Sequence, residues 1–254
     1  MKFARYRHGR RRGYALVEDN VLRPIVGTPY GRWRTSDDAI PLTEARLLAP
    51  VRPSKVLAVA LNYRSHVEGS ALPGPREEPK TPELFLKPPS AIIGPEEAIR
   101  LPAGSARVDY EGELVAVIGR RARRVASETA LDYVLGYTCG NDVSARDWQQ
   151  GDIQWWRAKG CDTFAPLGPW LVTDLDPTGL ELRTRVNGRE VQHTSTASLI
   201  HNVACLVSSA SQVMTLLPGD VIFTGTPGTT APLQKGDLVE VEIDGIGVLR
   251  NPVR

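Results

Sequence analysis

The chain has 254 residues, of which 41% are hydrophobic and 24% charged, and this composition excludes general disorder. Its 31 Lys and Arg against 29 Asp and Glu give a net charge of +2, which leaves little field for nucleic acid or a membrane surface. No apolar run approaches the roughly 20 residues that span a bilayer. The basic N-terminus lacks the apolar stretch of a signal peptide. Because the three widely spaced cysteines also favour reduced thiols, we expect a cytoplasmic protein.

The first fifty residues predict a small β-rich domain. Short strands separated by turn signals are expected at 2–7, 13–17 and 21–26. Arg10–Arg12 fall in the first turn, where we interpret them as a solvated hairpin tip in preference to a phosphate site. Residues 49–53 contain two prolines and predict a linker, because proline is disfavoured inside helices and central strands. We therefore divide the chain into domains at 1–50 and 51–254, and we expect the smaller one to pack on the larger.

Beyond the linker, strand signals outnumber helix signals. Segments of strand length occur at 55–61, 84–87, 108–118, 134–139, 170–173, 180–186, 220–224 and 238–243. Helical patterns are expected at 126–133, 144–150 and 198–216. Because strands and helices do not alternate regularly, the pattern predicts a mixed, largely antiparallel sheet. Residues 69–82 are rich in Gly, Pro and charge and predict a mobile loop or lid.

Three carboxylates alternate along the predicted strand 108–118. Asp109, Glu111 and Glu113 would project from one face, because alternate residues of a strand share a face. Carboxylates this close repel one another unless a cation or protons compensate them. The pattern therefore predicts a metal site, with an exposed acidic stripe as the alternative, and it does not choose among the three residues.

A second acidic element follows the predicted strand 134–139. Asp142 is either a further ligand or the cap of the helix that follows. On that helix Arg146 and Gln149 lie three residues apart and are neighbours, and their guanidinium and amide groups suit an oxygen-rich acidic ligand. Carboxylates without Cys or His nearby favour Mg²⁺, Mn²⁺ or Ca²⁺ over Zn²⁺.

Two further segments contain residues of interest. Lys159 lies in a polar stretch between turn residues, where a surface lysine is the alternative to a functional one. Residues 224–228, Thr-Gly-Thr-Pro-Gly, follow an apolar strand, and their small size lets backbone amides approach a ligand. The chain contains neither a P-loop nor a G-x-S-x-G elbow.

Six ordered segments resemble the successive motifs of a known family. They are Asn62-Tyr63-Arg64-Ser65-His66, Phe85-Leu86-Lys87-Pro88, Tyr110-Glu111-Gly112-Glu113-Leu114, residues 141–149, residues 159–169 and Phe223-Thr224-Gly225-Thr226-Pro227. The family is that of fumarylacetoacetate hydrolase, and within it the chain is most similar to bacterial 2-hydroxyhepta-2,4-diene-1,7-dioate isomerases. The resemblance implies a mainly β (α+β) fold, a mixed β-sandwich roll behind the small N-terminal domain, and a homodimer.

The resemblance also implies roles for residues of this sequence. They are Glu111, Glu113 and Asp142 as ligands of Mg²⁺ or Mn²⁺; Arg146, Gln149, Thr226 and Asn62 around a small carboxylate substrate; and His66, Lys159 and Glu68 as catalytic groups. Asp109 has no ligand role in the family pattern, which implies a supporting or surface position.

One departure from the family pattern bears on the reaction. Hydrolases and decarboxylases of the family carry His-x-x-Glu, a dyad that activates water, whereas here Glu68 is only two residues after His66. Residues two apart do not face each other on a helix, so Glu68 would have to reach His66 from an irregular lid, with Glu77 or Glu78 as substitutes. An isomerase needs only proton removal and return across an enolate, with His66 or Lys159 as the shuttle.

The predicted function is therefore that of a metal-dependent isomerase or tautomerase of the 2-hydroxyhepta-2,4-diene-1,7-dioate (5-carboxymethyl-2-hydroxymuconate) type in aromatic catabolism. A C–C hydrolase of acylpyruvates or fumarylpyruvate ranks second, and an oxaloacetate-type β-keto-acid decarboxylase third. The non-enzyme alternative is an inactive protein that binds small acids. The expected partners are a small carboxylate and a second copy of the chain, without nucleic acid or membrane.

Overall fold

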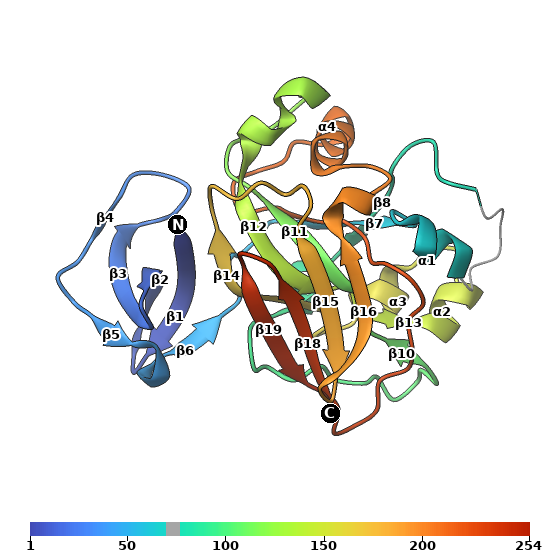
Figure 1. Cartoon of the computed structure of the whole chain (residues 1–254), viewed down its shortest axis with the longest axis horizontal. Helices are drawn as coiled ribbons and strands as arrows, with labels where there is room; N and C mark the ends of the chain where they lie inside the picture. Colours follow the sequence, from blue (N-terminus) through green and yellow to red (C-terminus); the bar gives the residue numbers. More distant parts are fainter. Residues whose placement is uncertain (70–76) are drawn as a thin grey trace.

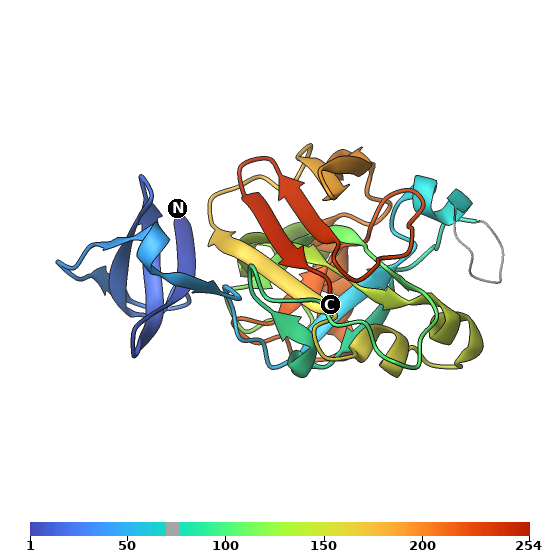
Figure 2. The ribbon, with the colours of Figure 1, turned by 90° about the horizontal axis from the view of Figure 1, so that it is seen from below.

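A computed structural model describes residues 1–69 and 77–254. In it the N-terminal residues form a small β-unit beside a larger body (Figures 1 and 2). Its elements are β1 (Lys2–His8), β2 (Arg11–Glu18), β3 (Val21–Gly27), β4 (Trp33–Thr35), β5 (Ile40–Pro41), η1 (Leu42–Glu44) and β6 (Arg46–Leu48). The three predicted strands are present, and Arg11 and Arg12 belong to β2, not to the turn before it. Strand β1 also pairs with β14 (Ala165–Val172) of the larger body.

Two sheets make up most of the larger body. Its elements are β7 (Val56–Ala60), α1 (Arg64–Gly69), β8 (Glu83–Lys87), η2 (Pro89–Ala91), β9 (Ile92–Ile93), β10 (Val108–Asp109), β11 (Gly112–Ile118), η3 (Ser127–Tyr133), β12 (Val134–Asn141), β13 (Ser144–Ala145), α2 (Arg146–Gly151), α3 (Trp156–Gly160), β14, β15 (Glu181–Val186), β16 (Arg189–Ser195), η4 (Thr196–Ser198), α4 (Val203–Val213), β17 (Val221–Phe223), β18 (Leu238–Ile243) and β19 (Gly247–Pro252). A 13-stranded sheet has the main order β4-β3-β2-β1-β14-β12-β11-β17-β7-β8, and a four-stranded sheet has the order β16-β15-β18-β19. Only the pairs β17–β7 and β14–β9 are parallel among the described strands. The predicted mainly β fold with a mixed, largely antiparallel sheet is confirmed.

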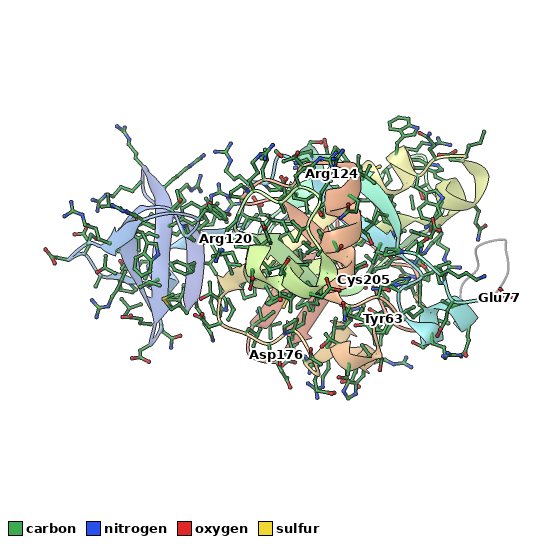
Figure 3. The ribbon with its side chains drawn as sticks, turned by 90° about the horizontal axis from the view of Figure 1, so that it is seen from above. Tyr63, Glu77, Arg120, Arg124, Asp176 and Cys205 are labelled. Carbon is green, nitrogen blue, oxygen red and sulfur yellow. The ribbon has the colours of Figure 1, made fainter. Side chains whose placement is uncertain are left out.

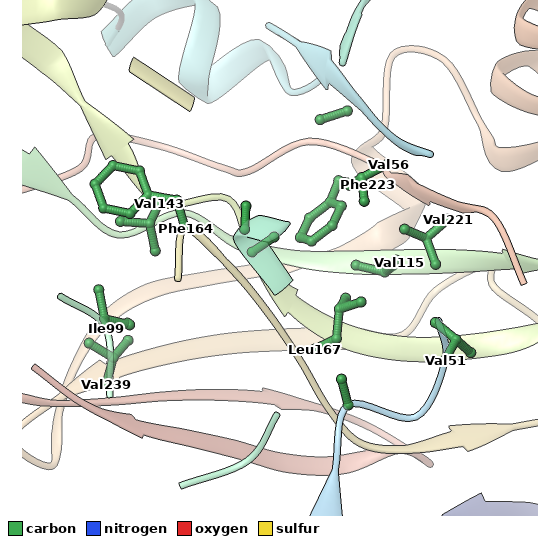
Figure 4. Close-up of a cluster of buried hydrophobic side chains, with 14 of the residues drawn as sticks. Val51, Val56, Ile99, Val115, Val143, Phe164, Leu167, Val221, Phe223 and Val239 are labelled. Carbon is green, nitrogen blue, oxygen red and sulfur yellow. The ribbon is translucent and has the colours of Figure 1, made fainter. Parts of the chain in front are cut away.

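Strand β11 lies at the centre of the fold and is buried along its whole length. Its alternate side chains enter two different cores, as the period of a strand requires. Val115 joins the apolar cluster with Phe223 and Leu167 that Figure 4 shows. Leu114 packs in the second cluster, to which Leu206 of α4 contributes. Burial on both faces holds β11, and the residues that precede it, in a fixed position.

Several element boundaries differ from those expected. The predicted strand 108–118 is interrupted at residues 110–111, because β10 pairs with β13 whereas β11 pairs with β12 and β17. The predicted helix 198–216 shortens to α4, which Asn202 caps by accepting the backbone N–H of Cys205 at 2.9 Å. Tyr63 forms an isolated antiparallel bridge with Leu199, ahead of α4.

The strands β16 and β19 were not predicted, because charged and polar residues interrupt their apolar patterns. The hairpin of β15 and β16 does carry a local signal, the dipeptide Asn187-Gly188, whose φ angles of 53° and 77° suit a tight hairpin turn.

The predicted lid at 69–82 falls largely on residues 70–76, which lie outside the described residues. Before this gap, Gly69 ends α1, and after it Glu78 pairs with Arg64 at 2.7 Å. Among the described helices, none is both long and apolar enough to cross a membrane.

Candidate active site

Three buried carboxylates meet at one end of the β11–β12 pair. Glu111 directly precedes β11, Glu113 lies within it, and Asp142 directly follows β12. Because the two strands are antiparallel, with Gly112 opposite Asn141, the start of one lies beside the end of the other. Ligand atoms of Glu111, Glu113 and Asp142 all lie within 4.8 Å of one another. The structure therefore brings the three predicted ligands together, and the alternative of an exposed acidic stripe is wrong.

Backbone hydrogen bonds fix this junction. The side-chain oxygen of Asn141 accepts the N–H of Glu111 at 2.8 Å, and the N–H of Asp142 donates to the carbonyl of Glu111 at 2.8 Å. Asn141 thus serves the site although no sequence pattern singled it out. The carboxylates therefore lie at a hydrogen-bonded junction between buried strands, which keeps their geometry constant.

Buried cations surround two of the three carboxylates. Lys159 Nζ lies 2.6 Å from oxygens of both Glu111 and Asp142. Lys87, which is buried in β8, pairs with the other oxygen of Asp142. Arg146 Nη2 lies 2.5 Å from Glu111. The alternative of a surface position for Lys159 is wrong.

Glu113 is compensated much less than its neighbours. It forms no salt bridge with any described side chain and accepts the backbone N–H of Gly225 at 2.6 Å. Burial and the nearby charges of Asp142 and Glu111 raise the pKa of Glu113 well above its usual range. Burial also acts on Glu111, but Arg146 and Lys159 outweigh it and hold the pKa of Glu111 well below its usual range.

This donor set fits a hard divalent cation. All three side chains offer carboxylate oxygens, the ligands that Mg²⁺ and Mn²⁺ prefer. The uncompensated charge of Glu113 is the feature that a bound cation would neutralise. A cavity of about 20 Å³ adjoins the carboxylates, enough for roughly one water-sized group. Its lining residues are Val59, Ala60, Leu61, His66, Glu111, Glu113, Arg146, Gln149, Trp155, Lys159 and Thr226.

Asp109 holds Arg146 in place from behind. It is fully buried, accepts two hydrogen bonds of 2.9 Å from Arg107, and lies 3.1 Å from Nε of Arg146. Arg146 also donates to Gln149 Oε1 at 2.8 Å and to Thr230 Oγ1 at 2.7 Å. Asp109 therefore has a supporting position, and the alternative of a surface position is wrong.

The loop after β17 closes another side of the cavity. Thr226 Oγ1 donates to the carbonyl of Gly112 at 3.0 Å and accepts from Gln192 Nε2 at 2.8 Å. Gln192 also accepts the N–H of Gly112 at 3.1 Å. Sequence reasoning missed Gln192, because it lies in the unpredicted strand β16. It also left Lys87 without a role, although a lysine that ends an apolar strand was a usable signal.

His66 reaches the cavity from α1. Its Nδ1 lies 2.6 Å from the carbonyl oxygen of Gly228. Because a carbonyl can only accept, we assign the proton to Nδ1, which leaves Nε2 as an acceptor. Burial lowers the pKa of His66, so the ring is neutral near pH 7.

Asn62 and Glu68, both predicted at the site, neither line this cavity nor belong to the carboxylate triad. Asn62 is fully buried, and its amide donates to the carbonyls of Thr224 and His201 at 2.8 and 2.9 Å while its oxygen accepts the N–H of His201 at 2.8 Å. It joins two loops and has no amide hydrogen left for a substrate. Glu68 is exposed on α1, and Glu77 lies at the outer edge of the molecule (Figure 3).

Comparisons with known proteins show the family to which the chain belongs. Residues 55–254 match the family model "Fumarylacetoacetate (FAA) hydrolase C-terminal", and residues 1–50 match the model "Rv2993c-like, N-terminal". Protein Rv2993c of Mycobacterium tuberculosis is 52% identical over 236 residues, which cover 92% of this chain and 88% of that protein. A mitochondrial oxaloacetate tautomerase of Xenopus laevis is 43% identical over 220 residues, which cover 82% of this chain and 68% of that protein.

Solved structures share the whole fold. The 5-carboxymethyl-2-hydroxymuconate delta-isomerase from Mycobacterium smegmatis superposes with a TM-score of 0.92 at 47% identity, covering 100% of this chain and 99% of that one. A maleylpyruvate hydrolase from Sphingobium sp. SYK-6, in complex with manganese(II) ion and pyruvate, gives a TM-score of 0.82 at 31% identity, covering 100% and 98%. The chain therefore belongs to the fumarylacetoacetate hydrolase family.

Proposed function

We propose that this enzyme is a divalent-metal-dependent isomerase or tautomerase of a small 2-oxo or 2-hydroxy-enoate carboxylic acid. The observation that carries the proposal is a buried carboxylate triad beside a small cavity that two of its members line together with a fixed arginine and a neutral histidine. The similarity to an isomerase and to a tautomerase supports the same reaction class.

Glu111, Glu113 and Asp142 would hold Mg²⁺ or Mn²⁺, which when bound supplies Lewis-acid polarisation of a substrate oxygen. Arg146 and Lys159 place positive charge beside the cavity before the reaction begins, which stabilises negative charge as it develops on the substrate. Both are held by carboxylates, so they do not need to reorganise. The chain thereby binds and orients an anionic substrate with its own side chains.

His66 is the better of the two predicted proton shuttles. Its Nε2 is unprotonated in the tautomer that Gly228 fixes, so it can accept a proton from the substrate and return it at another atom. Although burial opposes the charged form, Asp142 and Glu111 raise the pKa of Lys159. Lys159 therefore stays protonated and is poorly suited to act as a base.

Hydrolysis remains the less favoured alternative. It requires an activated water, and Glu68 is exposed and absent from the residues that line the cavity. Of the two substitutes for Glu68, Glu77 lies at the outer edge of the molecule (Figure 3), and Glu78 pairs with Arg64. Proton transfer by His66 alone is enough for isomerisation but not for water activation by a His–Glu dyad.

We further propose a 2-hydroxyhepta-2,4-diene-1,7-dioate type diene from aromatic catabolism as the substrate. A second candidate is the keto–enol conversion of oxaloacetate, which the similarity to mitochondrial oxaloacetate tautomerases supports. The two differ in chain length, so both belong in one assay.

The test is a product analysis of Mg²⁺-loaded protein with such a diene, enol-oxaloacetate and an acylpyruvate. In H₂O we expect a product of the same mass as the substrate. In D₂O we expect the product to carry one deuterium from the solvent. His66→Gln should lower kcat about 10²–10⁴-fold without changing metal affinity. Release of pyruvate with uptake of water would favour the hydrolase instead, loss of CO₂ the decarboxylase, and oxalate binding without turnover the non-enzyme alternative.

A further inference from the structure

A second cavity lies away from the carboxylate triad, between the N-terminal strands and the larger body. Its volume is about 700 Å³, within the range of small-molecule sites. Arg5 of β1 and Arg52 of the linker contribute to its wall, together with Ser90 of η2 and Ile92 of β9. None of these four residues lines the cavity at the triad.

The two arginines have no carboxylate partners. Arg5 donates to the carbonyl of Ala49 at 2.7 Å, and within residues 1–69 and 77–254 neither Arg5 nor Arg52 forms an ion pair. The one acidic residue in the wall is Glu97, which is bound by Arg46 at 2.5 Å and by the N–H of Gly94 at 2.6 Å. The cavity therefore carries positive charge that the described residues leave uncompensated.

The neighbouring sheet face adds further positive charge. Arg7 of β1 lies directly opposite Arg12 of β2 on one side and Arg46 of β6 on the other, and Arg5 lies two residues away on the same face. Like charges directly opposite each other destabilise a sheet. Burial is the main cause that lowers the pKa of Arg5; Tyr14 acts against it, and the nearby charge of Arg52 adds to it. An anion bound here would offset this repulsion.

We propose that this cavity binds a small organic molecule through a phosphate or diphosphate group held by Arg5 and Arg52. A guanidinium presents a planar fork of donors that matches such an oxyanion. Arg5 and Arg52, which form no ion pair with any described residue, suit a group with more than one negative charge better than a single carboxylate. Partly exposed apolar residues of the wall, Leu48 and Ile92, leave a surface for the organic part. The proposal does not depend on the reaction at the triad.

The test uses inorganic pyrophosphate as the probe, titrated calorimetrically into the full chain at low salt with EDTA present. We expect saturable binding of one pyrophosphate per chain. Arg52→Gln and Arg5→Gln should each weaken it by about tenfold or more, because each removes a charge-assisted contact. Arg10→Gln is the matched control: it removes the same charge from an exposed turn that does not line the cavity, and it should retain the affinity.

Arg5→Gln also removes the hydrogen bond to Ala49, so Arg52→Gln, which loses no hydrogen bond, keeps the test valid if the first variant misfolds. Unchanged affinity in Arg52→Gln would overturn the proposal, and so would an equal loss in Arg10→Gln, which indicates unspecific attraction. Arg146→Gln, which removes a cation from the cavity at the triad, should bind pyrophosphate as the natural chain does, and loss there would move the binding to the triad. Succinate should bind about tenfold more weakly, and tighter binding of succinate would contradict the phosphate group.

Discussion

Charge compensation in the site is uneven from one carboxylate to the next. Glu111 contacts Lys159 and Arg146, and Asp142 contacts Lys159 and Lys87. Glu113 receives one backbone N–H. Buried charge without a partner is costly, so the free energy that a cation can recover is concentrated on Glu113.

The first prediction concerns Glu113→Gln. Because the folded-state pKa of Glu113 is raised, the metal-free protein loses stability as pH rises from the usual glutamate range towards that pKa. The neutral amide avoids this loss, so at pH 7.5 in EDTA the variant should melt at the same temperature as the natural chain or a few degrees higher. Mg²⁺ or Mn²⁺ should raise the Tm of the natural chain and not of the variant.

Thermal melts with and without metal between pH 5 and 8 check this. Glu83→Gln, at the exposed start of β8, is the control and should keep the full response to metal. An equal rise in Tm for Glu113→Gln and the natural chain would show that Glu113 is not a ligand.

The second prediction concerns Asp109→Asn. This change removes the buried carboxylate that Arg107 and Arg146 share and leaves Arg146 paired with Glu111, and it should lower the free energy of unfolding by about 3 kcal/mol at pH 7. Burial tends to raise the pKa of Asp109, but hydrogen bonds from Arg107 and Thr230 outweigh it and lower that pKa. The stabilisation is therefore present above the usual aspartate range and is lost as pH falls below about 4.

Urea unfolding at pH 7 and pH 3 measures the difference, which should shrink at the lower pH. In kinetics, KM should rise through Arg146 while metal affinity stays constant. A gap of the same size at both pH values would contradict the assigned ionisation of Asp109.

At the scale of elements, the sequence predicted the acidic cluster but not the element boundaries within it. Alternation along 108–118 grouped Asp109 with Glu111 and Glu113. The strand is interrupted between β10 and β11, however, and Asp109 pairs with Arg107 instead. The reason is that β10 pairs with β13, a segment 35 residues away, and the local pattern of polar and apolar residues does not predict such long-range pairing. The three carboxylates that the family resemblance implies as ligands lie close together, and their role as ligands stays a prediction. Gln192 lies on the β15–β16 hairpin, whose second strand was not predicted, so only the structure places it beside Gly112.

The third prediction concerns Gly112→Ala, between Glu111 and Glu113. A Cβ at this position would lie 2.0 Å from Thr184 Oγ1 of β15 and 3.3 Å from Gln192 Oε1 of β16. One strand must move, which should cost about 1–3 kcal/mol of stability. Because Gly112 opens β11, the movement also displaces the carboxylates on either side.

Calorimetric titration of Mn²⁺ should therefore show at least about tenfold weaker binding. Gly151→Ala is the control, since a Cβ there meets nothing within 4 Å. A lower Tm with unchanged Mn²⁺ affinity would show that the ligands do not depend on the contact between β11 and β15.

At the scale of the whole molecule, the N-terminal unit is tied to the larger body through its first residues. Lys2 and Phe3 pair with Val172 and Leu171, and Phe3 packs edge-on against Trp33 in a core shared with the larger body. The hydroxyl oxygen of Tyr30 lies 3.3 Å from the point that a Cβ on Gly219 would occupy. These contacts agree with the expectation that residues 1–50 pack on the rest.

The last prediction is that the protein is a homodimer. Within the described residues, large apolar side chains remain exposed at the α2–α3 corner: Ile153 is fully exposed, and the side chain of Trp156 is 72% exposed. An exposed tryptophan beside an exposed isoleucine is typical of a protein interface. The helix α4, by contrast, buries Leu206, Val207 and Ala210 in the core.

Sedimentation velocity at micromolar concentration should therefore show a species of twice the 27.8 kDa chain mass. Trp156→Asp should shift it to the monomer with little change in Tm, because an exposed side chain contributes little to the stability of the isolated chain. Val213→Asp, at the exposed end of α4, is the matched control and should stay dimeric. A natural chain that sediments only at 27.8 kDa would refute the dimer, whereas a dimer that persists in Trp156→Asp and dissociates in Val213→Asp would move the interface to α4.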